Sequence, residues 1–256
     1  MHSIFGTKHL VIVAISIVLI VALFFLSRKL RFKTVCKAMF YIGIVSETIK
    51  IFYYIVQNES VYGGVLPKTD LPFHLCSIQI LFIAVVNISK SEKIKRFLLS
   101  FMFPSCLFGG IAAILIATYS SLNGLLIITA QYFLYHIAIT VFALNVCTNK
   151  KITLNVSDYF NCLKFLAVLM FFAVYINSIL YDGQHDINFM YVVSPPQSGL
   201  PFLNKDQGWL VYILRYAFLV VLCVTLCYIK PIVTAIKTKF KKTPVSNDEN
   251  GKTEQE

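Results

Sequence analysis

Residues 10–26 read LVIVAISIVLIVALFFL, an apolar run in which Ser16 is the only polar residue. A helix needs roughly 20 mostly apolar residues to cross the hydrocarbon core of a bilayer, which is about 30 Å thick. Ser27, Arg28 and Lys29 follow the run, where a signal peptide would have a small-residue cleavage site. Since a signal peptide also carries its positive charge before the apolar region, we expect a retained membrane span.

The composition of the whole chain agrees with this interpretation. Of the 256 residues, 57% are hydrophobic and 14% are charged, and the mean hydropathy is +0.73. Soluble domains have about 45–50% apolar and about 25% charged residues. A cytosolic enzyme, a disordered protein and a disulfide-stapled secreted domain are therefore excluded. The sequence predicts an all-α polytopic protein of the cell membrane.

Six further stretches have the length and composition of spans, so we expect a bundle of seven transmembrane helices within residues 1–230. Beyond it, residues 231–242 are basic with interleaved apolar residues, and we expect this juxtamembrane segment to lie on the anionic inner leaflet. Residues 243–256 are polar without a hydrophobic period, which predicts a disordered cytoplasmic tail. The expected spans are 10–27, 36–57, 71–88, 97–118, 124–148, 159–180 and 209–229.

Basic residues alternate between successive connections. The connections after the first, third and fifth spans, together with the tail, hold most of the lysines and arginines, whereas the others hold only Lys8, Lys68 and Lys205. Lysine and arginine accumulate on the cytoplasmic side of membrane proteins. We therefore expect an outside N-terminus and a cytoplasmic C-terminus. The net charge of +11 then reflects topology, and no nucleic-acid partner is expected.

Five of the expected spans carry polar residues in their outer halves. At a rise of about 1.5 Å per residue, these lie roughly 5–18 Å below the outer ends of the helices. Ionisable groups are costly inside a membrane and usually face the bundle interior. We interpret the set as the lining of one outward-facing polar cavity. Its members are Glu47, Lys50, His74, Cys76, Gln79, Gln131, His136, Asn177 and Arg215.

Each of these residues also has a purely structural interpretation. Glu47 and Lys50 can pair at i,i+3, amides often join neighbouring helices, and Lys50 and Arg215 can snorkel to the interface. As a set, however, two cations and one carboxylate leave an excess positive charge. Such a cavity suits a phosphate or carboxylate, so a membrane lipid or another anionic amphiphile is the expected partner.

The third span begins with Asp70-Leu71-Pro72-Phe73-His74-Leu75-Cys76. Asp70 is the expected N-cap, and Pro72 fits the first turn. A helix N-terminus lowers the pKa of a nearby thiol, so Cys76 is a candidate nucleophile with His136 as its base. On a regular helix the side chains of His74 and Cys76 diverge, so His74 is the less favoured base. Alternatively, Cys76 is a small buried hydrophobe and His136 a neutral interhelical group.

The outer connection 181–208 is long and contains aromatic residues and prolines. We expect it to fold at the interface as a lid over the cavity, with an ordinary aromatic anchor as the alternative. No cofactor and no metal site are expected, because the spacings of zinc, P-loop and serine-hydrolase motifs are absent.

The sequence LPFHLC (71–76) at the start of a span resembles the LPxHxC motif of YwaF-like bacterial integral membrane proteins. QYFLYH, which ends at His136, resembles that family's histidine-bearing span. INFMYVVSPP (187–196) resembles its N-Y-M-Y…P loop, with Phe189 in place of a tyrosine, and this adds Asn188 and Tyr191 to the candidate binding residues. The family looks distantly related to a eukaryotic multispan ether-lipid acyltransferase family, which implies Cys76 and His136 as the reactive pair.

The leading hypothesis is an enzyme that transfers or hydrolyses acyl lipids through Cys76 and His136, while His74, Lys50 and Arg215 position an anionic headgroup. The alternative is a non-catalytic transporter or receptor for a small anionic or amphiphilic ligand. A third hypothesis is a structural scaffold in a larger complex.

Overall fold

The computed structural model describes residues 5–57, 64–149, 152–183, 185–197, 200 and 202–241. In these residues every regular element is helical, so the all-α prediction is confirmed. The α-helices are α1 (Thr7–Ser27), α2 (Phe32–Gln57), α4 (Leu75–Ile88), α5 (Glu92–Leu115), α6 (Tyr119–Asn123), α7 (Leu126–Thr148), α8 (Val156–Leu180), α9 (Trp209–Cys227) and α10 (Ile229–Lys241). Two short 3-10 turns are η1 (Lys68–Asp70) and η2 (Phe189–Tyr191).

Within the described residues, six helices are long and apolar enough to cross a membrane, namely α1, α2, α5, α7, α8 and α9. The remaining expected span corresponds to α4, which has only 14 residues. At 1.5 Å per residue α4 is about 21 Å long, shorter than a bilayer core. A membrane protein with several spans is therefore supported, while the seven-span count and the orientation of the termini stay predictions.

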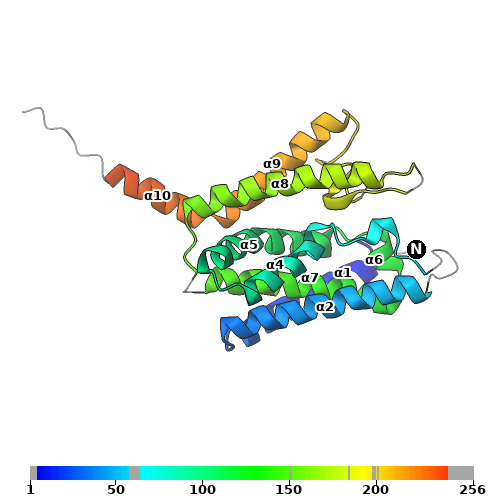
Figure 1. Ribbon diagram of the computed structural model, residues 1–256, viewed down its shortest axis with the longest axis horizontal. Coiled ribbons are helices and arrows are strands. Elements are labelled where there is room, and N and C mark those ends of the chain that lie inside the picture. The colour runs from blue at the N-terminus through cyan, green and yellow to red at the C-terminus, as the bar shows by residue number, and fades with distance from the viewer. Residues whose placement is uncertain are drawn as a thin grey trace, which may run out of the picture.

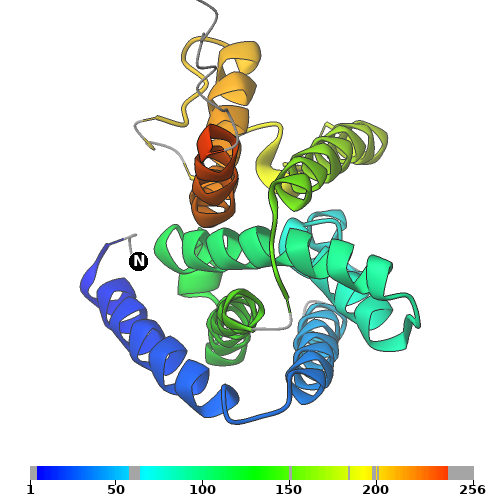
Figure 2. The ribbon, with the colours of Figure 1, turned by 90° about the vertical axis from the view of Figure 1, so that its left-hand side faces the viewer.

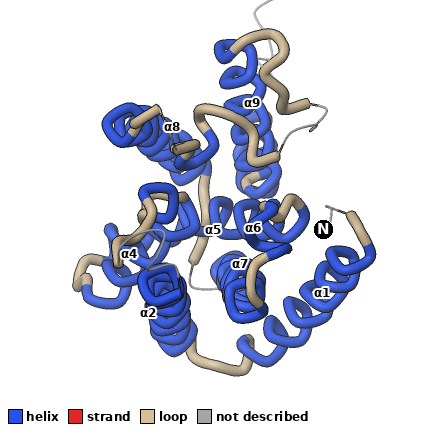
Figure 3. The backbone as a smooth tube through the Cα atoms, turned by 90° about the vertical axis from the view of Figure 1, so that its right-hand side faces the viewer, coloured by secondary structure: helices blue, strands red, loops and turns tan. Residues whose placement is uncertain are grey.

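The helices form two layers, and α5 lies where the layers meet (Figure 1). In the first layer α7 packs against α1, α2 and α5, and α4 packs against α2 and α5 (Figure 2). In the second layer α8 and α9 lie over the opposite side of α5 (Figures 1 and 3). α5 and α7 lie at the centre and are correspondingly buried. In the most apolar stretch of each of these two helices 61% of the residues are buried, against 6% for α1 and 11% for α9. The outer helices thus present apolar side chains outward, as lipid requires.

A glycine allows α5 and α7 to pack closely. A Cβ atom at Gly110 on α5 would lie 2.2 Å from Thr140 Oγ1 and 2.9 Å from the His136 carbonyl oxygen on α7. Thr140 Oγ1 also donates a 2.8 Å hydrogen bond to that carbonyl. Small residues at helix contacts are a common means of close packing in membranes. Gly110 therefore sets the separation of α5 from the turn of α7 that carries His136.

The start of α4 corrects one detail of the sequence prediction. The helix begins at Leu75 with His74 at its N-cap position, so Asp70 does not cap it. Asp70 instead ends η1, and Leu71 has extended backbone angles (φ −60°, ψ 149°). The residue before a proline is pushed out of the helical region, so Pro72 delays the helix.

The C-terminal division into a basic juxtamembrane segment and a disordered tail stays a prediction. The chain leaves the helical conformation at Tyr228, between α9 and α10. The basic juxtamembrane segment 231–242 is then helical as far as Lys241, as part of α10. The predicted disordered tail 243–256 lies outside the described residues.

Gly110→Ala should lower the thermal stability of the detergent-solubilised protein, because overpacking a fixed helix contact typically costs about 1–3 kcal/mol. Gly109→Ala is the matched control, since a Cβ there meets nothing within 4 Å. Differential scanning fluorimetry of both variants measures the effect. Equal melting temperatures for the two variants would contradict this account of the α5–α7 contact.

Candidate functional site

Lys50 ties α2 to the chain that leads into α4. Its Nζ donates a 3.0 Å hydrogen bond to the backbone carbonyl of Asp70 and lies 2.7 Å from Glu47 Oε1. The contact between Lys50 and Glu47 has the distance of an ion pair but not the angles of a hydrogen bond. Among the residues that the structure describes, Glu47 Oε1 has no hydrogen-bond partner. Burial raises the pKa of the Asp70 carboxyl, opposed by the nearby charge of Lys50. Lys50 therefore fixes where the segment containing His74 and Cys76 begins.

Cys76 is the second residue of α4 and faces the interior of the bundle. Tyr135 on α7 donates a 2.7 Å hydrogen bond from its hydroxyl to the Cys76 carbonyl, which fixes the first turn of α4 against α7. The thiol lies within electrostatic range of Lys50 and of the hydroxyls of Tyr132 and Tyr191. The helix N-terminus and the nearby cation stabilise negative charge on the sulfur and so offset only part of the cost of burying a thiolate.

His136 is buried on α7, and one of its ring nitrogens is already engaged. Nδ1 lies 2.7 Å from the backbone carbonyl of Tyr132. A carbonyl can only accept, so Nδ1 carries the proton and Nε2 keeps its lone pair. The Tyr132 ring lies 4.3 Å from the His136 ring, centroid to centroid, and packs beside it. This tautomer leaves Nε2 as the atom that can accept a proton.

His74 lies in the same region, because it precedes the helix and is not part of it. Its backbone is extended (φ −68°, ψ 147°), so the divergence expected for two residues on one regular helix does not apply. Its ring packs against Phe189 and Tyr191, at centroid distances of 5.1 and 5.5 Å. His74 and His136 are within electrostatic range of each other. We call Cys76, His74, His136, Tyr132 and Tyr191 the Cys–His cluster.

The segment 187–196 covers this cluster and is held by side chains from α8 and α9. Asn177 on α8 makes two hydrogen bonds with the backbone of buried Phe189, accepting from its N–H at 2.8 Å and donating to its carbonyl at 3.2 Å. Tyr216 on α9 donates to the Met190 carbonyl at 3.0 Å, and Tyr212 donates to the Tyr191 carbonyl. The lid expected from the sequence corresponds to a clamped loop.

The loop adopts a backbone conformation that non-glycine residues rarely use. Met190 and Tyr191 have φ values of 55° and 54°, in the left-handed region. Such conformations cost about 1–3 kcal/mol each and persist only where surrounding contacts impose them. In this conformation the Tyr191 ring packs against the His74 ring. The carbonyls of Met190 and Tyr191 accept hydrogen bonds from Tyr216 and Tyr212 on α9.

The remaining candidate residues join elements of the fold. Gln79 donates to Ser105 Oγ on α5 at 3.0 Å, and Gln131 donates to Ser46 Oγ on α2 at 2.6 Å. Gln79 Oε1 is buried without a hydrogen-bond partner. These amides act between helices, as the structural interpretation proposed.

Two other candidates interact within the outer connection. Asn188 donates to the carbonyl and hydroxyl of Ser194, both at 2.8 Å, and so stabilises the fold of the loop. Arg215 donates to Asn204 at 3.1 Å and to Gln207 at 2.7 Å. The structure therefore brings Cys76, His74, His136 and Tyr191 together with Lys50 near them, while Arg215 is bound to the connection before α9.

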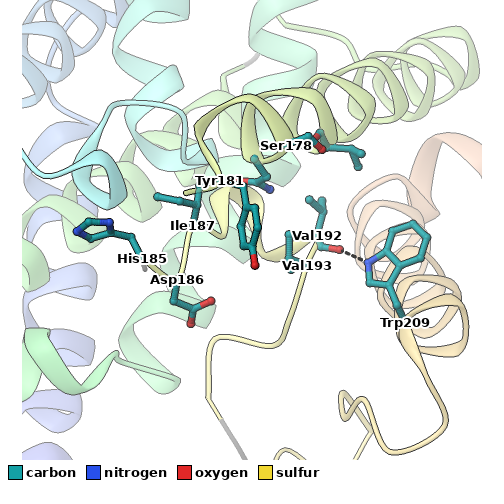
Figure 4. Close-up of a pocket in the computed structure, with 10 residues that line it drawn as sticks. Ser178, Tyr181, His185, Asp186, Ile187, Val192, Val193 and Trp209 are labelled. Carbon is teal, nitrogen blue, oxygen red and sulfur yellow. Dashed lines mark hydrogen bonds between the residues drawn. The ribbon is translucent and has the colours of Figure 1, made fainter. Parts of the chain in front are cut away.

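A cavity of about 480 Å³ lies behind the loop, between the end of α8 and the start of α9. Its walls include Asn177, Ile187 and Val192, and Trp209 closes one side by donating a 2.9 Å hydrogen bond to the Val192 carbonyl (Figure 4). Most of its lining is apolar. The cavity shares the loop with the Cys–His cluster but does not contain its side chains.

The structure offers no ready metal site in the part of the chain that it describes. Within these residues, no group of three or more His, Cys, Asp or Glu side chains could hold one ion. The Cys–His cluster combines a thiol, two imidazoles and tyrosine hydroxyls, and a thiol beside an imidazole is a combination used in nucleophilic catalysis.

The sequence pattern singled out Tyr191 but none of the other tyrosines that build the site. Tyr132 lies four residues before His136, and so on the same helix face, and Tyr135 precedes it directly. Tyr212 and Tyr216 are likewise four residues apart on α9, and their rings are stacked at 6.2 Å. The i,i+4 spacing was a readable signal that each pair shares a face, but which backbone groups they meet depends on other helices.

Comparison with known proteins gives one result. The model of the TMEM164 family matches residues 4–228, nearly the whole helical part of the chain. No curated protein and no solved structure gives a significant match. The match and the apolar helices agree on a multi-pass membrane protein, and the cell membrane as its particular location stays a prediction.

Asn177→Ala should release the loop, because it leaves the buried N–H and carbonyl of Phe189 without partners. The expected loss is about 2 kcal/mol or more of the free energy that keeps the loop closed. Hydrogen–deuterium exchange over residues 187–193 should become faster by at least tenfold. Ser178→Ala is the control, since its exposed hydroxyl donates only to the Val174 carbonyl on its own helix. Unchanged exchange in Asn177→Ala would show that other contacts hold the loop.

Proposed function

The chain belongs to the TMEM164 family of membrane proteins, and from this premise we propose that it transfers or hydrolyses the acyl chains of membrane lipids through Cys76. The observation that carries the proposal is that a thiol at a helix N-terminus, two imidazoles and tyrosines lie within electrostatic range of one another in one partly buried cluster. These groups come from α4, α7 and the loop 187–196, far apart in the sequence.

In the proposed reaction Cys76 is the nucleophile and His136 the base. The thiol proton moves to His136 Nε2, and the sulfur attacks the carbonyl carbon of an ester-linked acyl chain. The ester C–O bond then breaks, the leaving alcohol takes the proton from His136, and a Cys76 thioester remains. By the same steps in reverse order, the acyl chain of the thioester then passes either to a second alcohol or to water. The first outcome is acyl transfer and the second is hydrolysis.

Tyr191 is suited to stabilise the charge that develops on the ester oxygen. Its hydroxyl makes no hydrogen bond with any residue that the structure describes, and it lies within electrostatic range of Cys76. A hydroxyl that can donate is the kind of group that stabilises an oxyanion. Lys50, the cation beside Cys76 and His74, would attract an anionic headgroup.

Access to the cluster requires movement of the loop. Phe189 is fully buried against His74, so the described conformation excludes an acyl chain from the cluster. The largely apolar cavity between α8 and α9 has a suitable lining for hydrocarbon and lies directly behind the same loop. Opening of the loop would connect the two spaces and admit the ester to Cys76.

Cys76→Ser and His136→Ala should abolish the lipid change that follows overexpression of the parent protein. Loss of a general base typically costs about 10²–10⁴-fold in rate, so the lipid profile should equal that of cells carrying an empty vector. Mass spectrometry of total lipids measures this. Matched controls are Cys162→Ser, a buried thiol in the core, and His185→Ala, an exposed imidazole paired with Asp182.

Two results would decide against the enzyme. If both Cys76→Ser and His136→Ala give the parent's lipid profile, the catalytic proposal is wrong. If Cys76→Ser is silent while Lys50→Gln abolishes the effect of the parent, a non-catalytic transporter or receptor for an anionic amphiphile is favoured.

A covalent intermediate provides a second test. Purified protein incubated with a phospholipid bearing an alkyne-tagged acyl chain should acquire a label that neutral hydroxylamine removes, as expected of a thioester. Cys76→Ala should lose the label, His136→Ala should label at least tenfold more slowly, and Cys162→Ala should label normally. Labelling that persists in Cys76→Ala would assign the nucleophile to another residue.

A further inference from the structure

A second cavity lies at the other end of the bundle from the Cys–His cluster. Its volume is about 1210 Å³, and it is formed where α1 turns into α2, where α4 turns into α5 and where α7 ends. The ends of these helices face the viewer in Figure 2. These are connections that the sequence predicts to be cytoplasmic. Among its lining residues are six cations and one carboxylate, which define what we call the basic pocket: Arg28, Arg31, Lys33, Lys90, Lys95, Arg96 and Glu92.

Most of this positive charge is not balanced inside the protein. Lys95 pairs with Glu92 at 2.7 Å, and Arg96 pairs with Asp158 at 3.0 Å while also donating to the Thr153 carbonyl. The other four cations have no carboxylate within ion-pair distance among the residues that the structure describes. They are Arg28, Arg31, Lys33 and Lys90.

The convergence of these cations is fixed by the fold. Asn87 on α4 donates to the Cys36 carbonyl on α2 at 3.1 Å, and Asn145 on α7 donates to Ser27 Oγ at the end of α1 at 2.8 Å. The two amides join α4 to α2 and α7 to α1, and so fasten four of the helix ends around the pocket. The positive charges are thus gathered at one cavity, although like charges repel.

The lining of the basic pocket also includes apolar residues. Val35, Val86 and Leu99 are buried in its walls, whereas Leu30 and Ile88 are 51% and 79% exposed beside it. Exposed apolar side chains next to unpaired cations match an amphiphile with an anionic head. Two guanidinium groups without carboxylate partners favour phosphate, since their paired donors match its oxygens.

We propose that the basic pocket binds the phosphate group of an anionic ligand, either the headgroup of an acidic lipid or a free phosphate compound. Basic pockets between membrane helices on the cytoplasmic side are known to take lipid headgroups. The site is separate from the Cys–His cluster and uses none of its residues, so it stands or falls independently of the acyl-transfer proposal.

The test is native mass spectrometry of the full-length protein in detergent, titrated with dioleoyl phosphatidic acid or with dioleoyl phosphatidylcholine. Phosphatidic acid should bind more tightly to the parent protein. A cation near an anionic lipid contributes about fivefold in affinity, so Arg31→Gln/Lys33→Gln/Lys90→Gln should weaken phosphatidic acid binding by at least about tenfold. Competition by inorganic phosphate distinguishes the two sources: displacement of the lipid indicates recognition of phosphate alone, and its absence indicates that the acyl chains contribute.

Lys164→Gln/Lys205→Gln/Lys230→Gln is the matched control, because it removes the same charge from exposed positions outside the basic pocket. It should leave binding within about twofold. All six substituted side chains are exposed, and thermal unfolding verifies that each variant is folded. If a triple variant fails to fold, the single substitutions Arg31→Gln and Lys90→Gln give the same comparison with Lys205→Gln. Equal loss in both sets, or equal binding of the two lipids by the parent, would overturn the proposal.

Discussion

The contact between α5 and α7 at Gly110 positions the helices and residues around it. Only a glycine at this point lets the backbone of α5 approach the His136 carbonyl and Thr140. α7 then serves as the surface on which α1 and α2 pack, and the other side of α5 carries α8 and α9. Without a hydrophobic driving force between helices in lipid, this close van der Waals packing is what holds such a bundle together.

The two proposed sites occupy opposite ends of this bundle and differ in their degree of closure. The Cys–His cluster is sealed by a loop with two residues in the left-handed region, clamped by Asn177, Tyr212 and Tyr216. A strained, clamped cover is suited to a reaction that must exclude water until the substrate enters. The basic pocket is open and its cations are exposed, which suits a ligand that binds from the membrane surface.

Polar side chains in the bundle serve structural and chemical purposes together. Lys50 anchors the start of α4 through the Asp70 carbonyl and also lies within electrostatic range of Cys76. Tyr135 fixes Cys76 through its carbonyl, and Asn177 holds the loop that packs on His74. A substitution at any of these positions alters the geometry of the Cys–His cluster, so matched controls are essential to separate chemistry from folding.

The sequence alone determined the helical, membrane-spanning class, because crossing a bilayer requires long apolar helices whose backbone groups are satisfied locally. It also identified Cys76, His74 and His136 as candidates. Only the tertiary structure decided which polar groups meet: Arg215 with Asn204 and Gln207, Gln131 with Ser46, and Asn177 with Phe189. The local pattern also failed to predict that α4 begins after His74. Because His74 precedes the helix, its side chain lies in the same cluster as that of His136. Such contacts depend on the rotation and register of one helix against another, and hydropathy along a single segment carries no information about either.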